Sequence, residues 1–370
     1  MKKYLLYFLV IFLLSCEGKK SGMISFPEQS RLSGQADVIE LACDPVDTVD
    51  IAVIGLEMGG IEAVRRLSLV NGARIKAIFD IVPENIAKAL AVLKKLKRPP
   101  AEEYDGEEEW RNICERDDID LIYICAPQYL HATMAVFAME NGKHVATEAP
   151  AALTLDECWD IVNTAEKTRR HLIMLEKSCY DRYEMAILNM AQQGFFGEVM
   201  SIESGDINPT FGIGPAAQIL NIHRGDKMNY LLSVSGANNT IIKTEMGKTM
   251  LIRNDSVSSR PYIRTYNIRG TNAFAQKNPA NLRDSVLKAY EHPIVKEFRK
   301  KDLIMDSRLI YCLQNGLPLD MDVYDAAEWS SVVVLGKVSA EHNGKPVWIP
   351  DFTRRSWDKI KGYKQYKNDK

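Results

Sequence analysis

The segment VDIAVIGLEMGG, residues 49–60, constrains the fold of this 370-residue chain more than any other. An apolar run leads into a glycine-rich turn and then an amphipathic stretch, which is typical of the first strand, turn and helix of a dinucleotide-binding unit. Gly55 and Gly60 hold the first and third positions of the expected G-x-G-x-x-G, but Glu57 occupies the middle one. A carboxylate there adds bulk and negative charge where the backbone would approach a pyrophosphate. The pattern therefore predicts the fold and leaves cofactor binding open.

Strands and helices alternate after this segment. The patterns predict strands at 49–55, 74–80, 121–125, 143–150 and 171–180, and helices at 61–69, 83–96, 133–140, 153–170 and 181–194. Such alternation indicates a parallel, doubly wound sheet. Later segments favour antiparallel strands at 198–207, 239–255 and 258–276, followed by a long helix at 322–341. We therefore expect an α/β protein with an N-terminal Rossmann-type doubly wound parallel sheet, followed by an α/β domain with an open, mainly antiparallel sheet.

The N-terminal residues predict export. Two lysines precede an apolar run that stops at Ser15 and Cys16, which is the pattern of a secretory signal and is too short to span a membrane stably. The ending Leu-Leu-Ser-Cys resembles the bacterial lipoprotein box, with Cys16 as the lipidated residue; an ordinary signal peptide with a chance cysteine is the alternative. We expect an exported protein, lipid-anchored in the periplasm or at the cell surface. Its predicted parts are a signal at 1–16, a tether at 17–48, a Rossmann domain at 49–150 and a substrate domain with a C-terminal helix and tail at 151–370.

Charge and cysteine content exclude several functional classes. A net charge of −2, with basic residues spread along the chain, does not favour nucleic-acid binding. The six cysteines after Cys16 show no C-x-x-C and no regular spacing. We expect most of them to be buried thiols and predict neither a disulfide framework nor a metal site.

Candidate ligand-binding residues follow the predicted strands at their carboxyl ends, which is the edge where ligands bind such sheets. Asp80 ends the second strand, where an acidic side chain would accept the adenosine ribose hydroxyls of a dinucleotide. Pro127 and His131 lie in CAPQYLH after the third predicted strand, and Glu148 lies in GKHVATEAP after the fourth. With the glycine turn, these residues define the predicted cofactor site.

Longer stretches carry a family resemblance. CAPQYLH and GKHVATEAP resemble the Gfo/Idh/MocA family of dinucleotide-dependent proteins. The run from EAPAALTLDECW to GFFGEV, with GIGPAAQILNIHRGDKMNYL, IMDSRLIYCLQNGLPLDMDVYDAAEWS and IPDFTRRSW, is similar to its glycoside hydrolase family 109 branch. The likeness covers most of the chain after residue 48. It implies an α-N-acetylgalactosaminidase with a tightly held NAD.

The resemblance also implies a mechanism and residue roles. The sugar is oxidised at C3, a base removes the acidified C2 proton, the glycosidic oxygen leaves, water adds and the hydride returns, so the usual carboxylate pair of glycosidases is not required. Tyr180 in LEKSCYDRYE matches the catalytic tyrosine and Glu148 the active-site glutamate, while His131 would line the nicotinamide and sugar side. Packing roles for Tyr180 and His131 are the alternatives. The implied partners are a carbohydrate with a terminal amino sugar and a second copy of the chain.

The chain departs from the family pattern near the expected site. Ala149 replaces the lysine of Glu-Lys-Pro, which assists proton transfer in the family's dehydrogenases, and Phe211 replaces the histidine of Thr-His-Gly. Three loops look shortened, before NPTFGIGP, after NYLLSVSG and between EFRKK and LIMDSRLIY. Ala149 disfavours a plain sugar oxidoreductase. The remaining hypotheses are an NAD-dependent glycosidase, active or of altered specificity, and a catalytically inactive carbohydrate-binding or scaffold lipoprotein.

Overall fold

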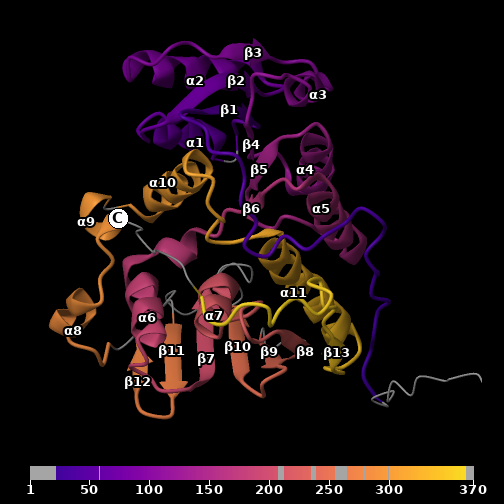
Figure 1. Cartoon of the computed structure of the whole chain (residues 1–370), viewed down its shortest axis with the longest axis vertical. Helices are drawn as coiled ribbons and strands as arrows, with labels where there is room; N and C mark the ends of the chain where they lie inside the picture. The colour runs from indigo at the N-terminus through magenta and orange to yellow at the C-terminus, as the bar shows by residue number, and fades with distance from the viewer. Residues whose placement is uncertain are drawn as a thin grey trace, which may run out of the picture.

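The computed structural model describes residues 22–57, 59–206, 212–234, 239–254, 265–277, 280–298 and 300–363. Two sheets organise this part of the chain (Figure 1). The long helix α11 (Val323–Glu341) packs against elements of both sheets, and α10 (Lys301–Gln314) packs against the glycine-turn helix of the first. No helix within the described ranges is long and apolar enough to cross a membrane.

The first sheet confirms the predicted parallel architecture. Its strands lie in the order β3-β2-β1-β4-β5-β6, and each neighbouring pair is parallel. In this order ligands bind at the carboxyl edge, where the winding reverses beside β1. The strands are β1 (Val49–Ile54), β2 (Ala73–Phe79), β3 (Glu102–Tyr104), β4 (Leu121–Ile124), β5 (His144–Thr147) and β6 (Leu172–Met174). The associated helices are α1 (Gly60–Leu67), α2 (Pro83–Lys95), α3 (Glu109–Cys114), η1 (Gln128–Leu130), α4 (His131–Glu140), α5 (Leu155–Thr168) and η2 (Lys177–Tyr180).

Two strands of this sheet differ from the sequence prediction. β3 is a three-residue edge strand of charged and tyrosine side chains, so no apolar alternation marks it. β6 pairs in parallel with β5, with Leu172 beside Val145. The parallel sheet therefore extends past residue 150, where the first domain was predicted to end.

The second sheet is mixed and mostly antiparallel. Its order is β12-β11-β7-β10-β9-β8-β13, and of its neighbouring pairs β7 and β10 run parallel. The strands are β7 (Val199–Asp206), β8 (Met228–Val234), β9 (Asn239–Thr244), β10 (Thr249–Asn254), β11 (Thr265–Gly270), β12 (Phe274–Gln276) and β13 (Val347–Trp348). Besides α10 and α11, its helices are α6 (Arg182–Gln192), α7 (Ile213–Ile219), α8 (Asp284–Ala289) and α9 (Ile294–Glu297).

Two helix ends carry signals that are visible in the sequence. Of the two N-cap candidates for α5, Thr154 and Asp156, the structure has Thr154, because its hydroxyl accepts a hydrogen bond from Glu157 N and the Glu157 carboxylate accepts one from Thr154 N. This capping box satisfies N–H groups that the helix itself leaves without partners. Gly194, with φ of +78°, closes the turn after α6. The six cysteines of the described residues are free thiols, and all except the partly buried Cys43 are buried.

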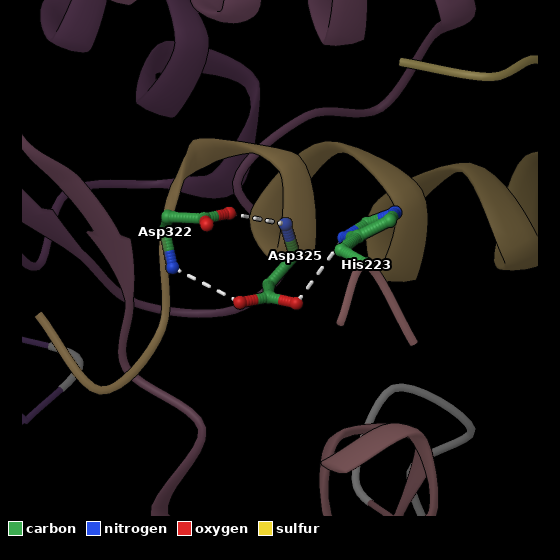
Figure 2. Close-up of side chains that lie close together, drawn as sticks. All are labelled: His223, Asp322 and Asp325. Carbon is green, nitrogen blue, oxygen red and sulfur yellow. Dashed lines mark hydrogen bonds and ion pairs between the residues drawn. The ribbon is translucent and has the colours of Figure 1, made fainter. Parts of the chain in front are cut away.

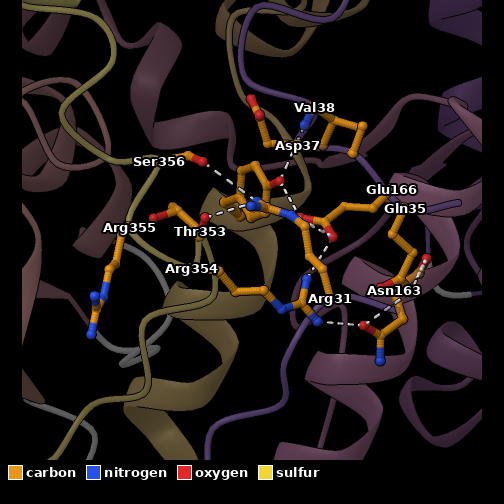
Figure 3. Close-up of polar contacts among 12 residues, drawn as sticks. Arg31, Gln35, Asp37, Val38, Asn163, Glu166, Thr353, Arg354, Arg355 and Ser356 are labelled. Carbon is orange, nitrogen blue, oxygen red and sulfur yellow. Dashed lines mark hydrogen bonds and ion pairs between the residues drawn. The ribbon is translucent and has the colours of Figure 1, made fainter. Parts of the chain in front are cut away.

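The predicted tether is described from residue 22, and we call residues 22–48 the N-terminal strap. It contains no helix, but Ile24 bridges Val347 of β13, and Val38 is buried in the core. Arg31 of the strap donates to Glu166 of α5, with Nη2 2.9 Å from Oε1 (Figure 3). The strap therefore lies along the folded body through apolar and charged contacts.

Glu166 joins the strap to the C-terminal segment. Its carboxylate is fully buried and accepts hydrogen bonds from Arg31, from Arg354 Nη1 at 2.6 Å and from the Tyr324 hydroxyl at 2.6 Å (Figure 3). A buried carboxylate is tolerated when cations and hydrogen bonds compensate for its lost hydration. Through these contacts Glu166 connects α5 with α11, the N-terminal strap and the chain after β13.

Candidate functional site

The turn between β1 and α1 requires glycine at Gly55 and Gly60. Gly55 has a φ of +86°, and a Cβ atom on it would lie 2.6 Å from the backbone nitrogen of Ala126. A Cβ atom on Gly60 would lie 2.0 Å from the carbonyl oxygen of Gly55. Neither position can hold a side chain without moving the backbone. The two glycines thereby let α1 start directly against the loop that follows β4.

The first turn of α1 fits a phosphate group. Its N-cap, Gly59, has a φ of +113° and provides no side-chain cap, and a Cβ atom there would meet no other atom of the described chain within 4 Å. Helix N-terminal N–H groups attract phosphate oxygens. The exposed Glu57 lies at the same turn, and its negative charge opposes that attraction. The backbone therefore fits the pyrophosphate of a dinucleotide, and the Glu57 side chain weakens the fit.

Asp80 connects the glycine turn to α2. Its carboxylate accepts hydrogen bonds from Leu56 N at 2.7 Å, Val82 N at 2.8 Å and Asn85 Nδ2 at 3.3 Å. A carboxylate offers about four acceptor positions, so about one is left for a ribose hydroxyl. Asp80 lies at the predicted edge of the sheet, where it also shapes the turn. Its contact with ribose stays a prediction.

Pro127 and His131 occupy different environments in the loop after β4. Pro127 is exposed at the start of η1. His131 is buried, with Nδ1 2.8 Å from the Pro150 carbonyl oxygen and Nε2 2.7 Å from that of Ala126. The imidazole therefore joins the loops after β4 and β5. These bonds favour the structural alternative for His131, and the predicted contact with cofactor or sugar stays untested, as it does for Pro127.

Glu148 extends from the end of β5 at the same edge. Its backbone nitrogen donates to the Ile124 carbonyl at 3.0 Å, and its Oε1 lies 3.0 Å from Lys177 Nζ. The side chains of Glu148 and Lys177 are 17% and 26% exposed. Burial and then the Glu148 carboxylate raise the pKa of the neighbouring Cys125 thiol, whereas Lys177 acts in the opposite direction. Glu148 and Lys177 thus form a partly exposed ion pair beside the glycine turn.

Tyr180 lies at the opposite end of η2 from Lys177. Its hydroxyl donates to Asp320 Oδ2 at 3.1 Å, and Arg308 binds both oxygens of that carboxylate at 2.8 and 3.0 Å. Burial lowers and the Asp320 carboxylate raises the pKa of Arg308, with a raised value as the net result. The bidentate pair fixes the carboxylate, and hence the orientation of the phenol.

A cavity of about 820 Å³ lies against Tyr180, which suits a sugar-sized ligand. Apart from Tyr180 and its neighbour Asp181, its lining includes Arg182, Glu291, Val295, Lys296, Lys300, Lys301, Asp302 and Ile304. Glu148 and Lys177 do not line it within the described chain. Helix η2 therefore presents Tyr180 to a cavity at one end and Lys177 to the sheet edge at the other. Phe211 and Cys16, the other residues predicted to matter, lie outside the described residues.

Sequence reasoning missed three polar groups around the site. Lys177 was not singled out, and neither was Asp320. Asp306 of α10 accepts hydrogen bonds from Arg66 of α1 at 2.7 Å and from the Tyr123 hydroxyl at 2.9 Å. These partners are distant in the sequence, so no local spacing connects them. The available signal was a charged residue within a largely apolar stretch, such as Asp306 in LIMDSRLIY.

A second buried polar cluster lies away from the glycine turn. His223, Asp322 and Asp325 offer ligand atoms within 4.8 Å of one another, a geometry that can hold a metal (Figure 2). Arg224 already binds the same carboxylates, with Nη1 2.9 Å from Asp325 Oδ1 and Nη2 3.2 Å from Asp322 Oδ2. The guanidinium therefore supplies positive charge to these carboxylates.

We expect His223 to make stability depend on alkaline pH. Burial lowers its pKa, but the carboxylates of Glu328 and Asp325, 3.3 and 3.4 Å away, raise it to about 10. Its stabilisation is fully present below about pH 6.5, the ordinary value, and is lost as the pH rises toward 10. The free energy of unfolding should fall above pH 7 by up to about 1.4 kcal/mol per pH unit. Urea unfolding of the wild type and His223→Gln between pH 7 and 10 checks this; equal slopes would contradict it.

Family models match both parts of the chain. The model described as "Oxidoreductase family, NAD-binding Rossmann fold" matches residues 49–175, and the one described as "Glycosyl hydrolase 109, C-terminal domain" matches residues 236–359. A glycosyl hydrolase family 109 protein of Bacteroides fragilis is 40% identical, covering 92% of this chain and 93% of the relative. A B. fragilis protein named alpha-N-acetylgalactosaminidase is 39% identical, covering 88% of this chain and 96% of the relative.

The same comparison bears on the predicted loop shortening. The alignment with the first relative extends over 431 positions, whereas 92% of 370 residues is about 340. This chain therefore lacks residues that the relative has.

Solved structures show the same fold at low identity. The structure of scyllo-inositol dehydrogenase from Lactobacillus casei with bound NAD(H) and scyllo-inositol has a TM-score of 0.65 at 15% identity, covering 81% of this chain and 99% of that one. A WlbA dehydrogenase from Bordetella pertussis, in complex with NADH and UDP-GlcNAcA, has a TM-score of 0.66 at 12% identity, covering 83% and 99%.

Proposed function

Because the chain belongs to glycosyl hydrolase family 109, we propose that it is an NAD-dependent glycosidase acting on α-linked N-acetylgalactosaminides. One observation carries the proposal: the glycine turn and Glu148 lie at the same carboxyl edge of a parallel sheet, and η2, which follows β6 of that sheet, brings Tyr180 to a cavity. The 39% identity to a protein named alpha-N-acetylgalactosaminidase supports the choice of sugar.

The residues of this chain have distinct parts in the proposed reaction. The N–H groups at the start of α1 bind the pyrophosphate, and Asp80 accepts a ribose hydroxyl. A bound NAD supplies reversible oxidation at C3 of the sugar, which acidifies its C2 proton. Tyr180, oriented by Asp320, and Glu148 exchange protons with the sugar. His131 holds the loop after β5, which carries Glu148, against the loop after β4.

The alternative is a catalytically impaired carbohydrate-binding protein. The residues that this chain lacks relative to its B. fragilis relative favour this alternative if, as the motifs predict, they come from the sugar-binding loops. Phe211, which cannot exchange a proton, favours it too. A plain sugar oxidoreductase is the third hypothesis.

We further propose that Cys16 carries a lipid and that the protein functions outside the cytoplasm, anchored to a membrane. The N-terminal charge and apolar pattern supports this location. We also propose a homodimer formed through the second sheet, in keeping with the family resemblance. Metabolic labelling with a fatty acid in wild type and Cys16→Ala tests the anchor, and sedimentation tests the dimer.

The decisive experiment is denaturation of the purified protein followed by measurement of released NAD by absorbance and mass. We expect stoichiometric NAD and hydrolysis of an aryl α-N-acetylgalactosaminide. Tyr180→Phe should lower hydrolysis by about 10²–10⁴-fold while NAD stays bound, because one proton-transfer group is lost. Absence of NAD would contradict the proposal that the protein depends on NAD. NAD without hydrolysis would favour the impaired alternative, and hydrolysis unchanged in Tyr180→Phe would remove that residue from the mechanism.

A further inference from the structure

Lys177 brings an amine to the edge of the sheet where Ala149 provides none. The segment after β6 runs beside the segment after β5, because Leu175 N donates to the Thr147 carbonyl at 2.8 Å. Lys177, two residues further on, reaches back to Glu148 with its Nζ at 3.0 Å from Oε1. An amine from the neighbouring strand's loop thus meets the carboxylate that directly precedes Ala149.

The other residues predicted for the site, His131 and Tyr180, are more strongly constrained. His131 is buried, and each ring nitrogen faces a backbone carbonyl. Tyr180 is 1% exposed, and its hydroxyl donates to Asp320. By contrast, the Glu148 and Lys177 side chains keep 17% and 26% of their surface exposed. A group that exchanges protons with a ligand must be accessible, and this pair is partly exposed.

We propose that Lys177 is a further catalytic residue of this chain, which contacts the reacting hydroxyl of the sugar and acts with Glu148 as a proton-transfer pair. The proposal rests on the proposed function. It also explains how the site works with alanine at position 149, because the amine enters from η2 instead of from the loop after β5.

The proton and electron balance is simple. A bound nicotinamide cofactor would supply the two-electron oxidation of the C3 alcohol, by taking its hydride, and the reverse reduction. The Glu148–Lys177 pair would accept the hydroxyl proton during the oxidation and return it to the oxygen during the reduction. No net oxidation remains. The ammonium also places positive charge beside an oxygen that becomes more negative as its proton leaves, which lowers the barrier.

The test compares Lys177→Met, which keeps an unbranched apolar stem, with Lys167→Ala. Lys167 is exposed in the last turn of α5 and serves as the matched control. For each full-length protein we would measure the melting temperature, the NAD released on denaturation, the pH profile of aryl glycoside hydrolysis, and the calorimetric affinity for free N-acetylgalactosamine. The double variant Ala149→Lys/Lys177→Met returns an amine to the sheet edge from the other loop.

We expect Lys177→Met to hydrolyse at least about 100-fold more slowly, with an altered pH profile, while it keeps its NAD and its melting temperature. Its sugar affinity should fall about tenfold, and the double variant should recover part of both losses. Lys167→Ala should match the wild type.

Wild-type rates and sugar affinity in Lys177→Met would overturn the proposal and leave the proposed function standing. If Lys177→Met loses NAD or unfolds, failure of the double variant to recover activity would likewise overturn it. A wild type that releases no NAD and hydrolyses no glycoside would overturn the proposed function, and the role of Lys177 with it.

Discussion

Gly60→Ala should abolish NAD retention and hydrolysis together. The new Cβ atom would lie 2.0 Å from the Gly55 carbonyl oxygen and 2.9 Å from its carbonyl carbon, so the backbone of the turn must move. That movement displaces the first N–H groups of α1, on which pyrophosphate binding depends. NAD released on denaturation and hydrolysis by the native protein are the two measurements. The melting temperature should also fall, because the turn joins two core elements.

Gly336→Ala is the matched control for this prediction. Gly336 lies in the middle of α11, where a Cβ atom would make ordinary contacts at 3.6 and 3.9 Å. Alanine in a helix is favoured over glycine by roughly 0.5–1 kcal/mol, so this variant should be at least as stable as the wild type and keep its NAD. Normal NAD content in Gly60→Ala would show that the turn does not bind the cofactor as proposed.

Glu166→Ala should lower the free energy of unfolding by about 3–5 kcal/mol, because it leaves buried cations without their partner. The side chain of Arg354 is 9% exposed and that of Arg31 25%, and both lose their carboxylate. The Tyr324 hydroxyl loses its acceptor as well. Urea unfolding at neutral pH measures the effect.

The control is Glu62→Ala, which breaks the exposed i,i+3 pair between Glu62 and Arg65. Surface pairs of this kind contribute at most about 1 kcal/mol, so stability should change little. A loss in Glu166→Ala no larger than in Glu62→Ala would mean that the cluster does not hold the strap to the body. Proteolysis within residues 22–48 offers a second measurement, since a released strap is cleaved faster.

The parallel, doubly wound architecture of the first sheet was predictable because its information is local. Buried parallel strands appear as apolar runs such as VDIAVI, and α5, which lies between β5 and β6, begins at the capping box of Thr154 and Glu157. β3 was not predicted because it is a short edge strand with charged side chains and has no apolar run. The strand β8 also escaped, because NYLLSVSG was interpreted only as the border of a shortened loop.

The candidate site was predictable only where one motif contains it. Gly55, Gly60, Asp80 and Glu148 lie at the carboxyl edge because each directly follows a strand or turn of the pattern. The Glu148–Lys177 pair spans two loops, and the Tyr180–Asp320 bond spans 140 residues. Such pairs form only when distant segments pack together in the fold, and the spacing of residues in a single sequence does not indicate which segments will meet.

The N-terminal strap limits the distance between the folded part of the protein and a membrane to which the chain is anchored. Within the described residues Ile24 bridges Val347 of the body, and seven residues lie between Cys16 and Ile24. A fully extended chain covers at most about 3.6 Å per residue, so the segment from Cys16 to Ile24 is shorter than about 30 Å. If Cys16 carries the lipid, the β13 end of the second sheet is held near the bilayer surface. A protein with the proposed function would then act only on glycans that come close to that surface.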